Sequence, residues 1–170
     1  MEIYLVRHAE ALERSEGLAD ELRHLTPKGR KQAAKQAKRL KKKLRPELII
    51  TSPLVRAVQT AELLAQQLGK KAVVRADACL AGDDEAEQVQ DMIRKLGALK
   101  SVMLVGHEPQ LSSVAALLLG CEHISPLQKG SCLALSWQPD KQDNHALFKW
   151  YAGNGKKPAS SARKALIRKA

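Results

Sequence analysis

The sequence predicts an α/β fold: a three-layer α/β/α sandwich whose sheet is mostly parallel and ends in an antiparallel hairpin. Short apolar segments alternate with segments in which apolar residues recur at helical spacing. The segments 48–50 and 102–105 are apolar at every position, which is typical of strands covered on both faces. Near the C-terminus, residues 131–137 and 146–151 instead alternate between apolar and polar, which predicts two antiparallel strands around Pro139-Asp140.

The first half of the chain contains two strand–helix units. Residues 2–7 form the first predicted strand, and the polar segment 10–21 forms a loop. Thr26 followed by Pro27 is typical of a helix N-cap and first turn, and apolar spacing extends that helix to about Leu44. The second strand, residues 48–50, follows after Pro46.

Ser52-Pro53 repeats the cap signal and predicts a second helix, which Gly69 ends. The remaining predicted elements are a strand at 72–74, a helix from Ala86 to near Gly97, a strand at 102–105 and a helix from Pro109 to Leu119.

Length and composition indicate a single domain. The chain has 170 residues, of which 44% are hydrophobic and 3% aromatic, so its core is built mainly from aliphatic side chains. We expect one folded domain at residues 1–152, which carries the candidate site, and a basic tail at 153–170. No apolar run approaches the roughly 18–20 residues of a membrane span, no signal peptide is evident, and three widely spaced cysteines suggest reduced thiols. These observations predict a cytoplasmic protein, and nothing in the sequence indicates an obligate oligomer, so we expect a monomer.

The net charge of +11 is concentrated in two segments. Residues 28–45 contain ten Lys or Arg and no acid, and residues 156–170 contain six and no acid. Both segments could attract a polyanion such as nucleic acid, polyphosphate or anionic lipid. A solvated helix face and a solubilising tail would produce the same pattern.

Four side chains follow three of the predicted strands. Arg7 and His8 end the first strand, Arg56 lies about one turn into the helix after the second, and His107 follows the strand at 102–105. Because the carboxyl ends of parallel strands share one edge of a sheet, we expect these side chains to converge there. Each residue alone also fits an ordinary surface or capping role, and it is their joint placement that favours a site.

This combination fits phosphoryl transfer without a metal or cofactor. The guanidinium groups of Arg7 and Arg56 can bind phosphate oxygens in pairs. His8 offers a neutral nitrogen for in-line attack, and the neighbouring cations favour its neutral form. His107 can donate a hydrogen bond to an equatorial oxygen in the transition state.

Three segments resemble the motifs of the histidine phosphatase superfamily. Leu5-Val6-Arg7-His8-Ala9-Glu10-Ala11 is similar to its amino-terminal signature, the segment 51–61 to its second motif, and Val105-Gly106-His107-Glu108-Pro109 to its third. The short chain and the pattern Asp20-x-x-Arg23-x-Leu25-Thr26-x-x-Gly29 resemble the SixA-type phosphohistidine phosphatases. The resemblance covers residues 1–150. It implies a phosphoglycerate mutase-like sandwich, a covalent phosphohistidine on His8, and a phosphate pocket of Arg7, Arg56 and His107.

The chain departs from the superfamily pattern at two points. Ala9 replaces a commoner Gly, and there is no room for the insertion that carries a general acid in larger members. Carboxylates at 83–87, including Glu85, lie in the corresponding stretch but also suit the first turn of a helix. Asp20 or Glu10 could assist from the first loop.

The lack of an evident acid favours a substrate whose leaving group needs little protonation. An alkoxide requires a proton donor, whereas the imidazole of phosphohistidine can leave without a strong acid. The sequence therefore predicts a phosphatase that acts on phosphohistidine of a partner protein, for which the resemblance suggests a histidine phosphotransfer domain. Two alternatives stay open: a small-molecule phosphoester phosphatase of the same superfamily, and a non-enzymatic polyanion-binding module.

Overall fold

A computed structural model describes residues 1–69, 72–82, 85–139, 145–153, 158–161 and 166. Six strands form one sheet in the order β3-β2-β4-β1-β5-β6. The first four strands of that order run parallel, while β5 is antiparallel to both β1 and β6. The predicted α/β fold with a C-terminal antiparallel pair is therefore confirmed. The strands span Glu2–Arg7 (β1), Leu48–Thr51 (β2), Val73–Ala76 (β3), Ser101–Gly106 (β4), Cys132–Ser136 (β5) and Leu147–Ala152 (β6).

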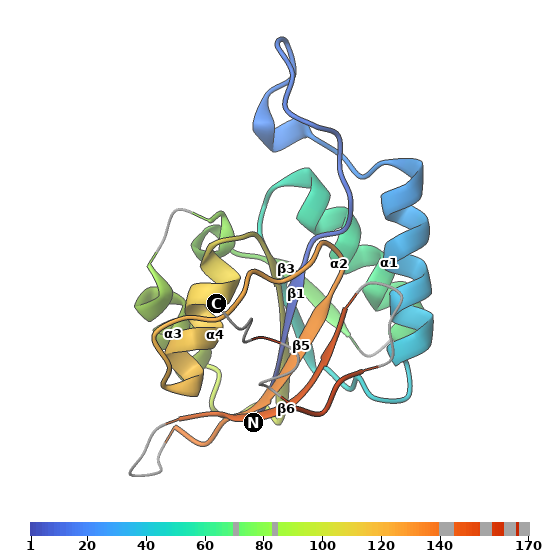
Figure 1. The fold of residues 1–170 in the computed structure, drawn as a ribbon. Coiled ribbons are helices and arrows are strands. Elements are labelled where there is room, and N and C mark those ends of the chain that lie inside the picture. Colours follow the sequence, from blue (N-terminus) through green and yellow to red (C-terminus); the bar gives the residue numbers. More distant parts are fainter. Residues whose placement is uncertain (70–71, 83–84, 140–144, 154–157, 162–165, 167–170) are drawn as a thin grey trace.

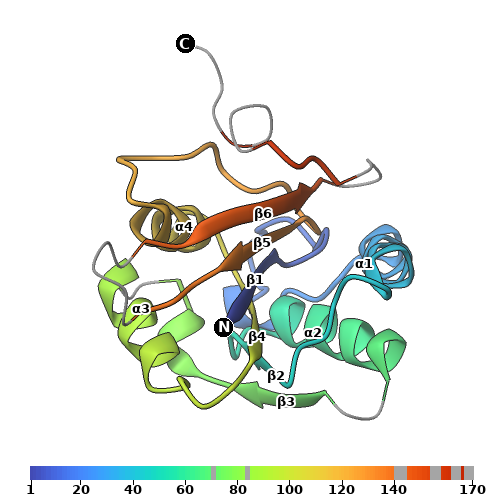
Figure 2. The same cartoon turned by 90° about the horizontal axis from the view of Figure 1, so that it is seen from below.

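Helices cover both faces of the sheet. Helices α1 and α2 lie on one side and α3 and α4 on the other, as Figures 1 and 2 show. Alternate residues of β1 enter different cores: Ile3 and Leu5 pack on the α3/α4 side, and Tyr4 and Val6 on the α1/α2 side. This two-sided burial explains why the central strands are apolar at every position. The helices span Pro27–Leu40 (α1), Val55–Leu68 (α2), Ala86–Arg94 (α3) and Gln110–Leu119 (α4), with 3₁₀ turns at Asp20–Leu22 (η1) and Ala78–Leu80 (η2).

Three predicted helix boundaries were wrong. Helix α1 ends at Leu40 rather than near Leu44, and α3 ends at Arg94 rather than near Gly97, since hydrogen-bonded turns continue each apolar stripe beyond the helix. Helix α2 begins at Val55, not at Pro53. The hydroxyl of Ser52 still accepts the N–H of Leu54, but in a turn that precedes the helix.

The chain between β1 and α1 projects beyond the carboxyl edge of the sheet, at the top of Figure 1. Its base is closed by a bridge between Ala11 and Leu25 and by the hydrogen bond from the Leu12 N–H to the His24 carbonyl. Thr26 caps α1 as predicted, since its hydroxyl accepts the N–H of Gly29. A side chain at Gly29 would collide with the backbone of Glu10, so this close approach requires glycine.

The described part of 153–170 returns to the domain. Ala159 pairs with Tyr151 of β6, and Leu166 is buried in the α3/α4-side core while its carbonyl accepts the N–H of Ser125. All six Lys and Arg of the predicted tail lie outside the described residues. In the part of the chain that the structure describes, no helix has the length and apolarity to cross a membrane.

Candidate active site

The structure brings the four predicted site residues together in one pocket. Arg7, His8, Arg56 and His107 line a cavity of about 390 Å³ at the carboxyl edge of the parallel strands. They reach it from the ends of β1 and β4 and from the first turn of α2, because β2, β4 and β1 are adjacent in the sheet. Five further side chains complete the lining: Glu13, Arg14, Arg23, Glu108 and Lys129.

His8 is held in one orientation and one tautomer. Its Nδ1 lies 2.7 Å from the carbonyl oxygen of Ala9, which can only accept a hydrogen bond, so Nδ1 carries the proton. The lone pair is therefore on Nε2. Burial, with smaller contributions from His107, Arg56 and Arg7, lowers the pKa of His8 to about 3 against the opposite effect of the Ala9 carbonyl. The ring is a neutral base at neutral pH.

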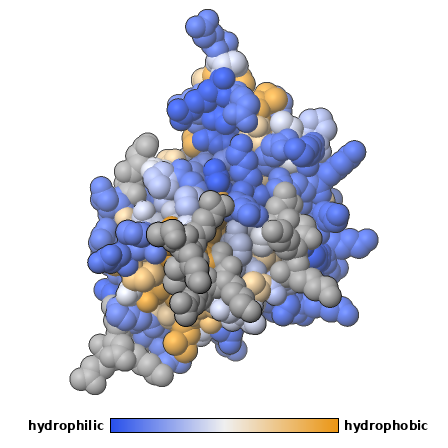
Figure 3. Space-filling view, in the orientation of Figure 1, coloured by the Kyte–Doolittle hydropathy of each residue, from blue (hydrophilic) through white to orange (hydrophobic). Residues whose placement is uncertain are grey.

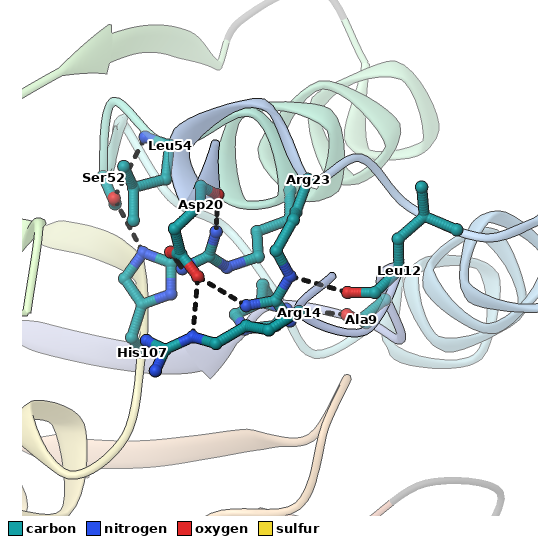
Figure 4. A network of polar contacts seen from close by, with 10 residues as sticks. Ala9, Leu12, Arg14, Asp20, Arg23, Ser52, Leu54 and His107 are labelled. Atoms are coloured by element: carbon teal, nitrogen blue, oxygen red, sulfur yellow. Dashed lines mark hydrogen bonds and ion pairs between the residues drawn. The ribbon is translucent and has the colours of Figure 1, made fainter. Parts of the chain in front are cut away.

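His107 lies beside His8, and its ring is held by Ser52, the residue that follows β2. The two ring centroids are 5.0 Å apart. Its Nε2 lies 2.7 Å from the hydroxyl oxygen of Ser52, as Figure 4 shows. Burial lowers the pKa of His107 to about 4, with the charge of Arg56 acting in the same direction. The other ring nitrogen, Nδ1, is buried and has no hydrogen-bond partner among the described residues.

Arg56 is buried, with 6% of its surface exposed, and the loop after β1 orients its guanidinium. Its Nη1 donates to the carbonyl oxygen of Asp20 at 2.7 Å, and its Nη2 to the Asp20 carboxylate at 2.8 Å. Two hydrogen bonds to one residue fix the plane of the guanidinium fork. A helix side chain and a projecting loop are thereby locked together.

The Asp20 carboxylate forms ion pairs with three arginines, of which Figure 4 labels Arg14 and Arg23. Besides Arg56, it binds Arg23 at 2.6 Å and Arg14 at 3.0 Å. Arg23 also donates to the carbonyl of Leu12, which ties it to the opposite side of the loop. Burial raises the pKa of Asp20, but the hydrogen bonds from the arginines outweigh this and hold the pKa well below its usual range. Asp20 is therefore a carboxylate that orients cations, and it has no proton to donate at neutral pH.

The other two candidate acids lie away from His8. Glu10 pairs with Lys28 at 2.7 Å and accepts the hydroxyl of Thr26, and these hydrogen bonds lower its pKa. Glu85 is exposed at the start of α3 and lines a neighbouring groove of about 520 Å³ rather than the pocket that contains His8. Neither residue lines the pocket.

Sequence reasoning did not single out several residues that line the pocket. Arg23 and Arg14 come from the projecting loop, and Lys129 comes from the segment before β5. Glu108 follows His107 directly, so its place in the third motif was the available signal. Arg23 stands in the pattern Asp20-x-x-Arg23, which was its signal, whereas Arg14 belongs to no motif and is turned toward Asp20 by the loop conformation alone.

The described residues do not contain any group of three His, Cys, Asp or Glu side chains placed to hold a metal ion. The pocket is instead lined by three arginines besides Arg7, and by Lys129. This donor set suits an oxyanion, since guanidinium and ammonium groups donate hydrogen bonds and accept none.

The site combines two histidines with several arginines at the carboxyl edge of an α/β sheet. This arrangement is typical of proteins that bind an oxyanion such as phosphate. The family profile of the histidine phosphatase superfamily (branch 1) matches residues 3–81. The chain belongs to this superfamily. It is 37% identical over 125 residues to an uncharacterised protein of Picosynechococcus sp., an alignment that covers 68% of this chain and 71% of the relative.

Solved structures share the fold at low sequence identity. A protein histidine phosphatase SixA complexed with tungstate superposes with a TM-score of 0.80 at 22% identity, covering 90% of this chain and 97% of that one. A putative phosphohistidine phosphatase SixA from Agrobacterium tumefaciens gives 0.78 at 22% identity, covering 89% and 97%. A mycobacterial glucosyl-3-phosphoglycerate phosphatase gives 0.72 at 21% identity, covering 90% and 99%. The structural relatives thus include phosphatases for both protein and small-molecule substrates.

Proposed function

We propose that this protein is a phosphatase that removes phosphate from phosphohistidine on a partner protein, through a covalent phosphohistidine formed on His8. The observation that carries the proposal is the state of His8. Its Nδ1 is committed to the Ala9 carbonyl at 2.7 Å, and its low pKa leaves Nε2 unprotonated at neutral pH. A neutral, oriented imidazole beside arginines is the nucleophile that such a reaction needs.

The reaction has two in-line displacements. In the first, Nε2 of His8 forms a bond to phosphorus while the bond between phosphorus and the substrate imidazole breaks. The electron pair of that bond stays on the substrate nitrogen, which takes a proton from solvent. In the second, water attacks the phosphorus, the bond to Nε2 breaks, and inorganic phosphate leaves with His8 neutral again. Arg7 and Arg56 neutralise the equatorial oxygens throughout.

The environment of the pocket supports a phosphoramidate substrate. Asp20 is held as a carboxylate, and Glu10 and Glu85 lie outside the lining. Of the two glutamates that line the pocket, Glu13 pairs with Lys129, and Glu108 is hydrogen bonded to Ser112 and Leu127. A substrate whose leaving group is imidazole does not need a strong enzymic acid. The pocket lies at the carboxyl edge of the parallel strands. The loop after β1 projects from that edge (Figure 1), and this position suits a phosphorylated side chain on another protein.

The lysines on the exposed face of α1 favour a partner whose docking surface is acidic. Lys31, Lys35 and Lys38 of α1 are exposed, as is Lys42 in the turn after it, and the flank of the molecule that contains α1 is hydrophilic in Figure 3. The helix begins directly after the projecting loop, whose Arg14 and Arg23 line the pocket. A partner docked over the pocket could therefore contact the first turns of α1, with an attraction that weakens as salt is added.

A panel assay tests the proposed function. A phosphohistidine protein, a phosphohistidine peptide, an aryl phosphate and sugar phosphates are compared under identical conditions for wild type and His8→Ala. We expect the highest kcat/KM on the phosphohistidine protein and no turnover by His8→Ala. A sugar phosphate preferred by tenfold or more would support the small-molecule alternative, and substantial turnover by His8→Ala would exclude the covalent mechanism. If wild type turned over none of the substrates yet bound polyphosphate or nucleic acid, the non-enzymatic alternative would stand.

A further inference from the structure

Of the two arginines predicted to bind phosphate, Arg7 is the less firmly held. Arg56 is fixed by two hydrogen bonds to Asp20, whereas the guanidinium of Arg7 makes one hydrogen bond among the described residues, from Nη1 to the carbonyl of Leu127 at 2.7 Å. Its Nε is buried and has no partner there. The orientation of Arg7 therefore depends on where the Leu127 carbonyl is placed.

The segment 127–130, here called the clip, is hydrogen bonded to the end of β1. The N–H of Gly130 donates to the carbonyls of both Arg7 and His8, at 3.1 and 3.0 Å. On the α1 side, the side-chain amide of Gln32 donates to the carbonyl of Lys129. At its other end the clip is held by a carboxyl group: the N–H of Leu127 donates to Oε1 of Glu108 at 3.2 Å.

Glu108 is itself anchored on α4. Its Oε2 lies 2.5 Å from the hydroxyl oxygen of Ser112, and that hydroxyl is 2.8 Å from the carbonyl of Pro109. The Ser112 hydroxyl is the donor in both contacts, so it holds the Glu108 carboxyl against the first turn of α4. Burial raises the pKa of Glu108, against the opposing effect of the hydrogen bonds that it accepts from Ser112 and Leu127.

We infer that Glu108 is a positioning residue, which sets the guanidinium of Arg7 for phosphate by holding the Leu127 peptide between α4 and β1. The path is continuous: Ser112 holds Glu108, Glu108 holds the Leu127 N–H, and the Leu127 carbonyl holds Arg7. This role rests on the proposed function, since it assumes that Arg7 binds the phosphoryl group. It differs from a general acid, because the carboxyl acts on the protein backbone and not on the leaving group.

A positioning role and a general-acid role of Glu108 predict different effects of replacing its carboxyl group by an amide. Glutamine can accept the Leu127 N–H through its carbonyl oxygen and donate to Ser112 through its amide, so Glu108→Gln preserves the clip. It cannot deliver a proton to a leaving group. Glu108→Ala removes both contacts. Misplacement of a binding group by about 1 Å can cost on the order of 100-fold in rate, so Glu108→Ala is expected to lose about 10- to 100-fold in kcat/KM.

The experiment uses wild type, Glu108→Ala, Glu108→Gln and, as a matched control, Ser113→Ala, which alters the next hydroxyl on α4 without touching Glu108. The measurements are tungstate affinity and turnover of two aryl phosphates, one with a good and one with a poor leaving group. We expect Glu108→Ala to weaken tungstate binding about tenfold and to slow both substrates by the same factor. Glu108→Gln and Ser113→Ala should stay within about twofold of wild type on both.

A double-mutant cycle identifies the route through Arg7. In an Arg7→Lys background, Glu108→Ala should cost little more, because the group it positions is already lost. The inference is overturned if the losses multiply, if Glu108→Ala matches wild type, or if Glu108→Gln fails only on the poor leaving group, which would make Glu108 a general acid. Failure of the proposed function looks different: wild type itself would then neither bind tungstate nor turn over any phosphorylated substrate.

Discussion

Ser52 is expected to contribute to both stability and catalysis, although the sequence indicated a helix cap first and a place in the second motif after it. It is fully buried, and its hydroxyl contacts Nε2 of His107 at 2.7 Å and accepts the N–H of Leu54 at 3.2 Å. Ser52→Ala leaves both groups without their partner. A buried polar group left unpaired costs about 1–3 kcal/mol, and the Leu54 N–H is only partly buried, so we expect a loss of about 2–3 kcal/mol in the free energy of unfolding.

The same substitution should slow the reaction. Without the Ser52 hydroxyl, the His107 ring loses the hydrogen bond that orients it. One hydrogen bond contributes about 1 kcal/mol, and about 1.4 kcal/mol corresponds to tenfold in rate, so kcat/KM should fall by about tenfold. Thermal unfolding should shift downward by about 4–12 °C, at about 2–4 °C per kcal/mol for a domain of this size.

The control is Ser101→Ala, which removes a buried hydroxyl at the opposite edge of the sheet. Ser101 begins β4, and its Oγ donates to the carbonyl of Arg45. This variant should also unfold at lower temperature, but its kcat/KM should match wild type. If Ser52→Ala and Ser101→Ala had the same kcat/KM at a temperature where both are folded, the assignment of Ser52 to His107 would be refuted.

Four other outcomes are expected. Because burial lowers the pKa of His8 to about 3, its neutral form persists on acidification, so kcat/KM corrected for substrate ionisation should stay level down to about pH 5; half-loss near pH 6.5 would contradict this. The folded-state pKa lies below the unfolded one, so the contribution of His8 to stability is full above about pH 6.5 and is lost as the pH falls toward 3, which acid unfolding monitored by circular dichroism can follow. Gly29→Ala should destabilise by about 1–3 kcal/mol and lower kcat/KM, because the new side chain displaces the Glu10 backbone at the base of the loop; thermal unfolding at wild-type temperature would disprove the close approach. Lys31→Glu with Lys35→Glu should reduce kcat/KM on an acidic phosphoprotein several-fold at low salt and leave an aryl phosphate unaffected; an equal loss on both would argue against docking on α1.

The fold was predictable because its signals are local. Continuous apolar runs in β2 and β4 indicate strands covered on both faces, and helical spacing between them indicates the covering helices. The Thr26 cap is confirmed by its hydrogen bond to Gly29. Helix ends were predicted less well, since the apolar stripe of α1 continues through a turn to Leu44, which is buried outside the helix. Burial and helical hydrogen bonding need not stop at the same residue.

For the site, the sequence determined which residues end the strands, and parallel strand order then placed Arg7, His8, Arg56 and His107 in one pocket. Tertiary structure alone decided how those groups are held. Asp20 meets Arg56 across 36 residues, and Leu127 meets Arg7 across 120, because loops fold back over the sheet edge. Such contacts depend on loop conformation and on burial, which local sequence does not encode. The same burial sets the neutral state of His8, and with it the chemistry available at the end of β1.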